Sequence, residues 1–179
     1  MSVAVGGAQS DSPEPRTSVS AHQITMSRPA AVDDLDHVNE MHARCSLTSR
    51  YARYGAARRA LTPREWRRLC DQAGGITLVT VPRRDPSSVI AVTCLMRTQS
   101  PQLRELGILI EDSWQGRGLG TTLTHHMVAF ARTHTLDCQA VTATTGSDNQ
   151  RMLSILRRLG ACISHPSEGN VDALIRVKA

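Results

Sequence analysis

The residues whose types and spacing best suit chemistry form the loop Gln115-Gly116-Arg117-Gly118-Leu119-Gly120. A strand pattern ending at Ile110 precedes this loop, and a helical pattern begins near Gly118. Glycines let the backbone turn tightly, so that successive amide N–H groups can approach one anion. The N-terminus of the following helix adds unpaired donors and a partial positive charge. The loop is therefore predicted to bind a pyrophosphate.

Two familiar phosphate-binding motifs do not fit this loop. A P-loop needs a Gly-Lys-Ser/Thr sequence, which does not follow here, and the glycines at 116, 118 and 120 do not have the spacing of the dinucleotide fingerprint. Taken alone, the short glycine pattern is equally typical of a plain glycine-rich turn leading into a helix. The elements around the loop must decide between these interpretations.

Strand and helix patterns alternate along the rest of the chain, with Gly and Pro at the boundaries. Strands are predicted at 24–27, 76–81, 89–97, 103–110, 139–144, 161–165 and 171–177. Helices are predicted at 32–42, irregularly within 46–59, from a capping box at Thr62 to Gly74-Gly75, from about Gly118 to Thr133, and from a capping box at 147–150 to Gly160.

The order of these elements predicts how they are joined. The strands at 76–81 and 89–97 are expected to pair antiparallel, and 103–144 to form a right-handed crossover unit. The expected fold class is α/β, with a mixed, mostly antiparallel, twisted central sheet flanked by helices. Residues 1–22 are rich in Gly, Ser and Pro and read as a flexible tail, whereas 23–179 form one domain.

Composition excludes several classes of protein. The net charge of +5 is carried by arginines, Lys178 being the only lysine, and it favours polyphosphate ligands. The arginines are dispersed and aromatics make up only 3%, so nucleic acid is not an expected partner. Five widely spaced cysteines without a CxxC predict reduced thiols in the cytoplasm and no metal site. No apolar run is long enough to predict a membrane span.

The stretch from 103 to 161 resembles the GNAT N-acetyltransferase superfamily. Its signature is a Gln/Arg-x-x-Gly-x-Gly/Ala loop between a strand and a helix, which Gln115, Gly118 and Gly120 match. Asn149, at the head of a helix that ends in Leu159-Gly160, resembles the downstream segment of the family. The resemblance covers most of residues 23–179 and implies acetyl-coenzyme A (acetyl-CoA) as cosubstrate.

The resemblance also implies where coenzyme A binds. Loop amides would hold the pyrophosphate, the strand edge at Ile108 and Ile110 would pair with the pantetheine arm, and Asn149 would hydrogen-bond that arm. Splaying of this strand from the one at 139–144 would open the slot. The expected cofactor-binding residues are Ile108, Ile110, Gln115, Gly116, Arg117, Gly118, Leu119, Gly120, Thr121 and Asn149. For Arg117, an exposed arginine on a polar loop is an equal alternative.

Direct acetyl transfer needs a neutral amine, so a base must take a proton from the substrate ammonium. The chain resembles the bacterial protein-lysine acetyltransferase subgroup over 105–118, where the catalytic glutamate of the subgroup corresponds to Glu105. A second resemblance covers 46–54, followed by Leu61-Thr62 and Glu65. Glu105 is the candidate base; the alternative is an exposed carboxylate paired with Arg104. Glu111 and Asp112 are second choices.

The general acid has no clear candidate. Many relatives have a tyrosine where this chain has Leu156, so water is left to protonate the thiolate. Tyr51 and Tyr54 are expected to line the acceptor side or to pack the helix.

The sequence therefore predicts an acetyl-CoA-dependent N-acetyltransferase that acts on a primary amine in a ternary complex. The alternative is a non-catalytic acyl-CoA-binding sensor, which the missing tyrosine favours. The acceptor, a protein lysine or a small amine, is left open, as is a homodimer, although the basic segment 44–60 weighs against aminoglycosides.

Overall fold

The computed structural model describes residues 24–134 and 137–178, so the predicted tail at 1–22 lies outside the described residues. These residues form one seven-stranded sheet in the order β1-β2-β3-β4-β5-β7-β6. The strands are β1 (Thr25–Pro29), β2 (Gly75–Pro82), β3 (Ala91–Arg97), β4 (Leu103–Ile110), β5 (Ala140–Gly146), β6 (Cys162–Ile163) and β7 (Asn170–Arg176). Every neighbouring pair is antiparallel except β4 and β5, which are parallel. The predicted mixed, mostly antiparallel sheet is confirmed.

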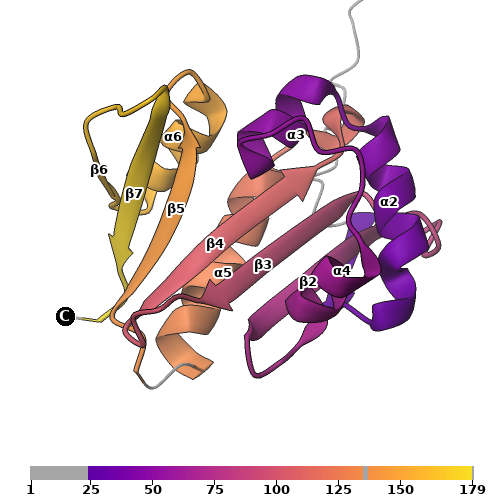
Figure 1. Cartoon of the computed structure of the whole chain (residues 1–179), viewed down its shortest axis with the longest axis horizontal. Helices are drawn as coiled ribbons and strands as arrows, with labels where there is room; N and C mark the ends of the chain where they lie inside the picture. Colours follow the sequence, from indigo (N-terminus) through magenta and orange to yellow (C-terminus); the bar gives the residue numbers. More distant parts are fainter. Residues whose placement is uncertain (1–23, 135–136, 179) are drawn as a thin grey trace, which may run out of the picture.

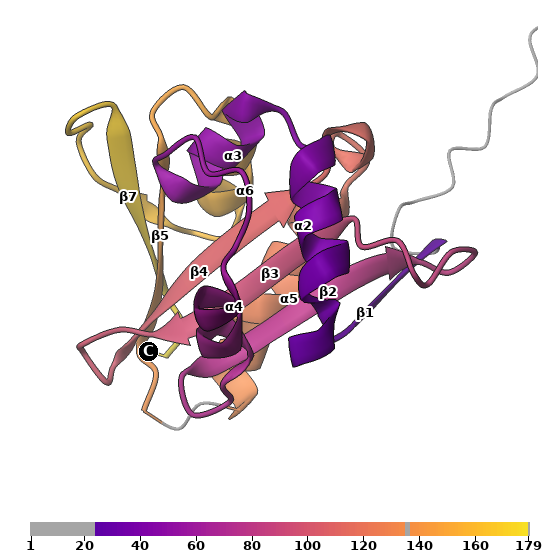
Figure 2. The ribbon, with the colours of Figure 1, turned by 45° about the vertical axis from the view of Figure 1, so that its right-hand side comes forward.

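Helices cover both faces of this sheet (Figure 1). The helices are α2 (Leu35–Arg44), α3 (Leu47–Tyr54), α4 (Pro63–Cys70), α5 (Leu119–His134) and α6 (Gln150–Arg158), with the short 3-10 turns η1 (Val32–Asp34) and η2 (Asp112–Trp114) before α2 and α5. Helices α2, α3 and α4 lie on one face and α5 on the other, as the rotated view also shows (Figure 2). The sheet is thus the middle layer of three.

Strand alternation divides the core between the two faces, because successive side chains point to opposite sides. Trp66 of α4 packs with Val79 and Leu109 on the face under α2 and α4. Leu106 lies on the same strand as Leu109, but its side chain points to the opposite face. There it packs with Met127 of α5 and Leu156 of α6. The buried residues of both layers are aliphatic or sulfur-containing apart from Trp66, with Phe130 and Tyr54 packed at their margins, which accords with the low aromatic content of the chain.

The caps of α3 and α4 explain where those helices start. The Ser46 hydroxyl accepts from the Ser49 amide at 3.2 Å at the start of α3. At α4 the Thr62 hydroxyl accepts from the Glu65 amide at 3.3 Å, and the Glu65 carboxylate accepts from the Thr62 amide at 2.9 Å. This reciprocal capping box confirms the predicted start of α4.

Three predicted boundaries are wrong. Helix α4 ends at Cys70 rather than at Gly74-Gly75, because Asp71 is extended and its carboxylate accepts from the Ala73 amide at 3.0 Å. The cap of α6 is Asn149 rather than Ser147. Strand β1 continues through Arg28-Pro29, where the sequence pattern placed its end.

The pairing of β4 with β5 is short, and this matters most for the site. It joins only Leu103–Glu105 to Ala140–Thr142. Beyond Glu105 strand β4 runs on to Ile110 beside β3, whereas β5 follows β7. The two strands therefore diverge, as Figure 1 shows, and the expected splay is present. None of the helices within 24–134 and 137–178 is long and apolar enough to cross a membrane.

Candidate functional site

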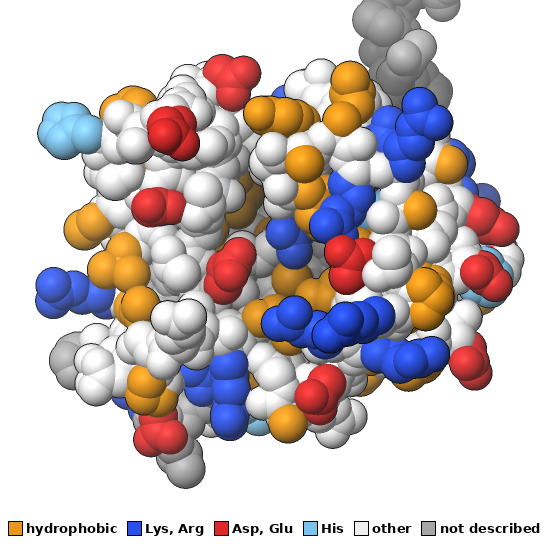
Figure 3. All heavy atoms as spheres, viewed as in Figure 1, with side chains coloured by type: hydrophobic (Ala, Val, Ile, Leu, Met, Phe, Trp, Pro, Cys, Tyr) orange, Lys and Arg blue, Asp and Glu red, His pale blue; other side chains and the backbone are white. Residues whose placement is uncertain are grey.

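A cavity of about 1130 Å³ lies where β4 and β5 diverge. Its walls come from α3, from β4 between Glu105 and Ile110, from the loop before α5, and from the start of α6 with the end of β5. Figure 3 shows the surface hollowed between the α3 side and the β5–β7 side. Most of the predicted site residues meet in this one cavity.

The glycine loop forms one end of the cavity. Gly116 and Gly118 have φ angles of +72° and +83°, which glycine adopts at little cost, and open space lies where a side chain would stand. The amides of Gly116, Arg117 and Gly118 have no hydrogen-bond acceptor within the described part of the chain. Those at the start of α5, from Leu119 to Thr121, have no intrahelical acceptor either. This run of free donors suits an anion.

Gly120 fits α5 closely against its neighbours. A side-chain carbon at this position would lie 3.4 Å from Ile110 Cδ1 and 3.4 Å from Ile155 Cδ1. The first turn of α5 therefore lies close to the end of β4 and to α6. This packing brings the helix N-terminus, with its partial positive charge, to the mouth of the slot.

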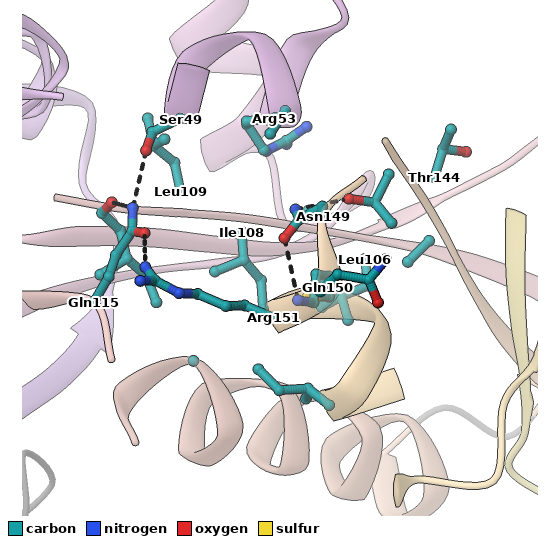
Figure 4. A pocket seen from close by; sticks show the side chains of 18 of the residues that line it. Ser49, Arg53, Leu106, Ile108, Leu109, Gln115, Thr144, Asn149, Gln150 and Arg151 are labelled. Atoms are coloured by element: carbon teal, nitrogen blue, oxygen red, sulfur yellow. Dashed lines mark hydrogen bonds between the residues drawn. The ribbon is translucent and has the colours of Figure 1, made fainter. Parts of the chain in front are cut away.

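Gln115 anchors the loop through its side chain. Its Nε2 donates to the Ile110 carbonyl and to Ser49 Oγ, both at 2.9 Å, and its Oε1 accepts from Arg151 at 3.2 Å (Figure 4). The loop is thereby tied to α3 on one side and α6 on the other. Gln115 lines the cavity as predicted, and the structure adds a bracing role to that position.

The free edge of β4 forms the floor of the slot. Ile108 and Ile110 line the cavity, and β4 has no pairing with β5 beyond Glu105. An unpaired strand edge offers backbone N–H and C=O groups to an extended ligand. The loop and Glu105 stand at opposite ends of this edge, and the distance from Ile110 to Glu105 is about 17 Å at the usual rise per residue.

Glu105 is exposed and faces the cavity. Its carboxylate forms no ion pair with any described residue. Arg104 is buried, and its guanidinium donates to the carbonyls of Pro101 and Leu103 at 2.8 and 3.0 Å. The alternative pairing of Glu105 with Arg104 is therefore wrong, because consecutive strand residues point to opposite faces of the sheet.

Asn149 lines the cavity, but part of its side chain is already engaged. Its Oδ1 accepts from the Met152 amide at 3.2 Å, and its Nδ2 donates to Thr145 Oγ1 at 2.9 Å. One Nδ2 hydrogen and one oxygen lone pair remain for a ligand. The same residue thus caps α6 and faces the slot.

Two predicted cofactor residues do not bring their side chains into the cavity. Arg117 is exposed and lies over the Trp114 ring, with its guanidinium carbon 5.6 Å from the ring centre. The Leu119 side chain is buried in the core with Leu123 and Ile90. Both residues can contribute backbone amides only, since their side chains have structural partners.

The second-choice bases, Glu111 and Asp112, lie outside the cavity lining. Glu111 accepts from Arg44 at 2.9 Å. Asp112 is exposed; the limited desolvation of its carboxylate opposes ionisation, but hydrogen bonds from Ser49 and Ser46 outweigh that effect and lower its pKa. Their carboxylates hold α2 and α3 to the loop, and the structure leaves Glu105 as the acidic side chain of β4 in the site.

Tyr54 and His42 form a buried polar pair beside the cavity. Tyr54 lines the cavity, and its hydroxyl lies 2.9 Å from His42 Nε2. Burial, reinforced by Arg50, Arg53 and Arg58, lowers the pKa of His42 to about 4, so the ring is neutral at pH 7. Burial also raises the pKa of Tyr54 to about 12, which keeps the phenol protonated. Tyr54 therefore packs against the core and also lines the cavity.

We expect the neutral His42 to make folding stability depend on pH. The unfolded imidazole has a pKa near 6.5 and the folded one near 4, so between these values the unfolded chain binds more protons. Stability should therefore fall as pH is lowered from about 6.5 to about 4. Thermal unfolding at a series of pH values should show a smaller loss for His42→Gln, whereas the exposed control His165→Gln should follow the native chain. Parallel profiles for all three proteins would contradict this expectation.

Several cavity residues escaped the sequence reasoning, among them Arg53, Arg151 and Gly107. Arg53 and Arg151 extend from α3 and α6 into the cavity region (Figure 4). Gly107 lies in the middle of β4, directly under Arg53. A glycine inside an otherwise apolar strand was the available signal, because it marks a place where another group approaches the backbone closely.

The fold is thus a mixed sheet in which two parallel strands diverge and leave a cavity between them. A family model described as the acetyltransferase (GNAT) domain matches residues 26–161. This chain therefore belongs to the GNAT acetyltransferase family. Among curated protein sequences, none matches it significantly.

Solved structures show the same fold. The GNAT domain of S. lividans PAT is 21% identical, with a TM-score of 0.73 over 85% of this chain and 90% of that chain. The putative acetyltransferase yncA from Salmonella typhimurium, solved with its cofactor acetyl-CoA, is 17% identical, with a TM-score of 0.67 over 87% and 95%. RimL, a ribosomal L7/L12 alpha-N-protein acetyltransferase in complex with coenzyme A, is 13% identical, with a TM-score of 0.63 over 86% and 94%.

Proposed function

We propose that this protein is an acetyl-CoA-dependent N-acetyltransferase that moves the acetyl group to a primary amine by direct transfer. The observation that carries this proposal is one cavity with free amides at one end, Glu105 at the other and an unpaired strand edge between them. Family membership and the relatives solved with acetyl-CoA or coenzyme A support the same cosubstrate.

In this proposal the cofactor lies along β4. Amides from Gly116 to Thr121 bind the pyrophosphate, and α5 contributes its N-terminal charge. The pantetheine arm adds to the β4 edge at Ile108 and Ile110, and the remaining donor of Asn149 reaches it from the other wall. The thioester then lies near the point of divergence, within reach of Glu105.

The transfer removes two protons from the acceptor ammonium, one before the attack and one after it. Glu105 takes a proton from the substrate ammonium, directly or through water. The amine nitrogen attacks the thioester carbonyl, a C–N bond forms and the C–S bond breaks; the second proton leaves the nitrogen and passes through water to the departing sulfur, so that coenzyme A leaves as the thiol. Leu156, fully buried in the core, has no proton to donate.

A non-catalytic acyl-CoA-binding module is the second candidate, and the burial of Leu156 at the usual tyrosine position favours it. Such a module needs the glycine loop and Asn149 but has no use for a carboxylate at Glu105. The exposed, unpaired Glu105 in the cavity supports the enzyme instead.

The test is coenzyme A release from acetyl-CoA in the presence of proteins, lysine peptides and small amines, with cofactor binding measured in parallel by calorimetry. Turnover with at least one amine is the expected result. Tight acetyl-CoA binding without turnover on any amine would support the binding module, and no binding would overturn both.

A further inference from the structure

Arg53 is a cation in the cavity wall and has no acidic partner among residues 24–134 and 137–178. It extends from α3 toward β4 (Figure 4). Its Nη2 donates to Cys94 Sγ at 3.1 Å, and its guanidinium carbon lies 5.0 Å from the centre of the Tyr54 ring. A thiol is a weak acceptor, so most of the five guanidinium donors remain available. Among the described residues, the arginine ion pairs involve only Arg28, Arg44 and Arg58.

The strand beneath Arg53 is shaped to receive it. Gly107 is paired with Cys94 of β3, and both lie under the guanidinium. A side-chain carbon added at Gly107 would overlap the guanidinium group. The glycine therefore lets Arg53 lie against the backbone of β4, at the middle of the strand that lines the slot.

Arg53 and Glu105 lie on the same face of the sheet. Residues two apart on a strand share a face and are about 6.6 Å apart. Gly107, which lies under Arg53, is therefore the next residue after Glu105 on this face of β4. An acceptor amine that reaches Glu105 therefore approaches beside Arg53. The two charges are opposite, and neither forms an ion pair with a described residue.

We propose that Arg53 binds a carboxylate of the acceptor, so that the substrate is a small amine with a carboxylate a few bonds from the reacting nitrogen, such as an amino acid. This inference deepens the proposed N-acetyltransferase function and rests on it for the position of the amine. The ammonium of such a zwitterion faces Glu105 while its carboxylate faces the planar donors of Arg53. An unmodified lysine side chain supplies the ammonium but not the carboxylate, and leaves Arg53 unpaired.

The experiment compares matched acceptors on the full chain. Amino acids, their methyl esters and their decarboxylated amines are assayed with the native protein, Arg53→Gln, Arg53→Lys and the control Arg50→Gln. Arg50 lies on the same helix, outside the cavity lining, and donates to backbone carbonyls. Binding of the amino acids to the coenzyme A-saturated protein is measured by calorimetry, so that the result does not depend on turnover.

The expected result is a kcat/KM for amino acids that falls by at least about 30-fold in Arg53→Gln, with the esters and amines unchanged. Arg53→Lys should recover part of this loss, since it keeps the charge without the planar donors. Gly107→Ala should lose the same preference, because its methyl group displaces the guanidinium without removing the charge. Arg50→Gln should keep the native preference.

Other outcomes separate this inference from the proposed function. Turnover of amines with no preference for a carboxylate overturns the inference alone. Arg53-dependent binding of amino acids without any turnover supports it while the enzyme proposal fails. If amino acids show no binding and no turnover, the inference is overturned. A last outcome is an Arg53-dependent preference for succinyl-CoA over acetyl-CoA with no discrimination between acceptors. It would overturn the inference, because the carboxylate bound by Arg53 would then belong to the acyl donor and not to the acceptor.

Discussion

Glu105→Gln should lower kcat with the best amine acceptor by about 10²- to 10⁴-fold while leaving acetyl-CoA binding unchanged. Glutamine has nearly the same shape and cannot take the ammonium proton. Glu105 forms no ion pair among the described residues, so the substitution breaks no salt bridge and the fold should be preserved. Steady-state assays together with calorimetric titration of acetyl-CoA measure the two effects separately.

The pH dependence of this variant gives a second readout. Without a base, the rate follows the fraction of acceptor that is already a free amine, which rises about tenfold per pH unit below the amine pKa. Raising the pH should therefore restore part of the lost rate. Glu40→Gln, an exposed position on α2 outside the cavity, serves as the control. A Glu105→Gln rate equal to that of Glu40→Gln would show that Glu105 is not the base.

Gly118→Val should weaken acetyl-CoA binding by roughly 5- to 150-fold. A β-branched residue at a φ of +83° is strained by about 1–3 kcal/mol, and the loop can relieve this strain only by leaving the conformation that directs its amides into the cavity. Equilibrium binding of acetyl-CoA or coenzyme A to the native chain and the variant is the direct measurement.

Gly160→Val is the matched control for this prediction. Gly160 has a φ of +79°, open space around it and no part in the cavity lining, and it lies at the end of α6. It should lose a similar amount of folding stability without losing cofactor affinity. If both variants bind acetyl-CoA like the native chain, the loop does not hold the pyrophosphate.

Local patterns in the sequence were enough to predict the elements that carry the site. Strand β4 lies at the predicted residues, 103–110, because its apolar run is bounded by Ser100-Pro101 and by the glycine loop. The capping box at Thr62 and the glycine positions of the loop depend on contacts within a few residues, which a sequence pattern contains. The predicted end of α4 was wrong, because the helix stops at Cys70, Asp71 is extended and its carboxylate accepts from the Ala73 amide.

The sequence by itself determined the α/β class and the glycine loop, since both rest on residue types at short spacing, and its resemblance to the GNAT superfamily made Glu105 and Asn149 candidates. Only the tertiary structure decided that Leu119 is core, that Arg117 lies on Trp114, and that Arg53 crosses to Gly107. The contacts of Leu119 with Ile90 and of Arg53 with Gly107 join segments that are far apart in the chain. Their geometry depends on how the helices pack on the sheet, and no periodicity within a segment encodes that packing.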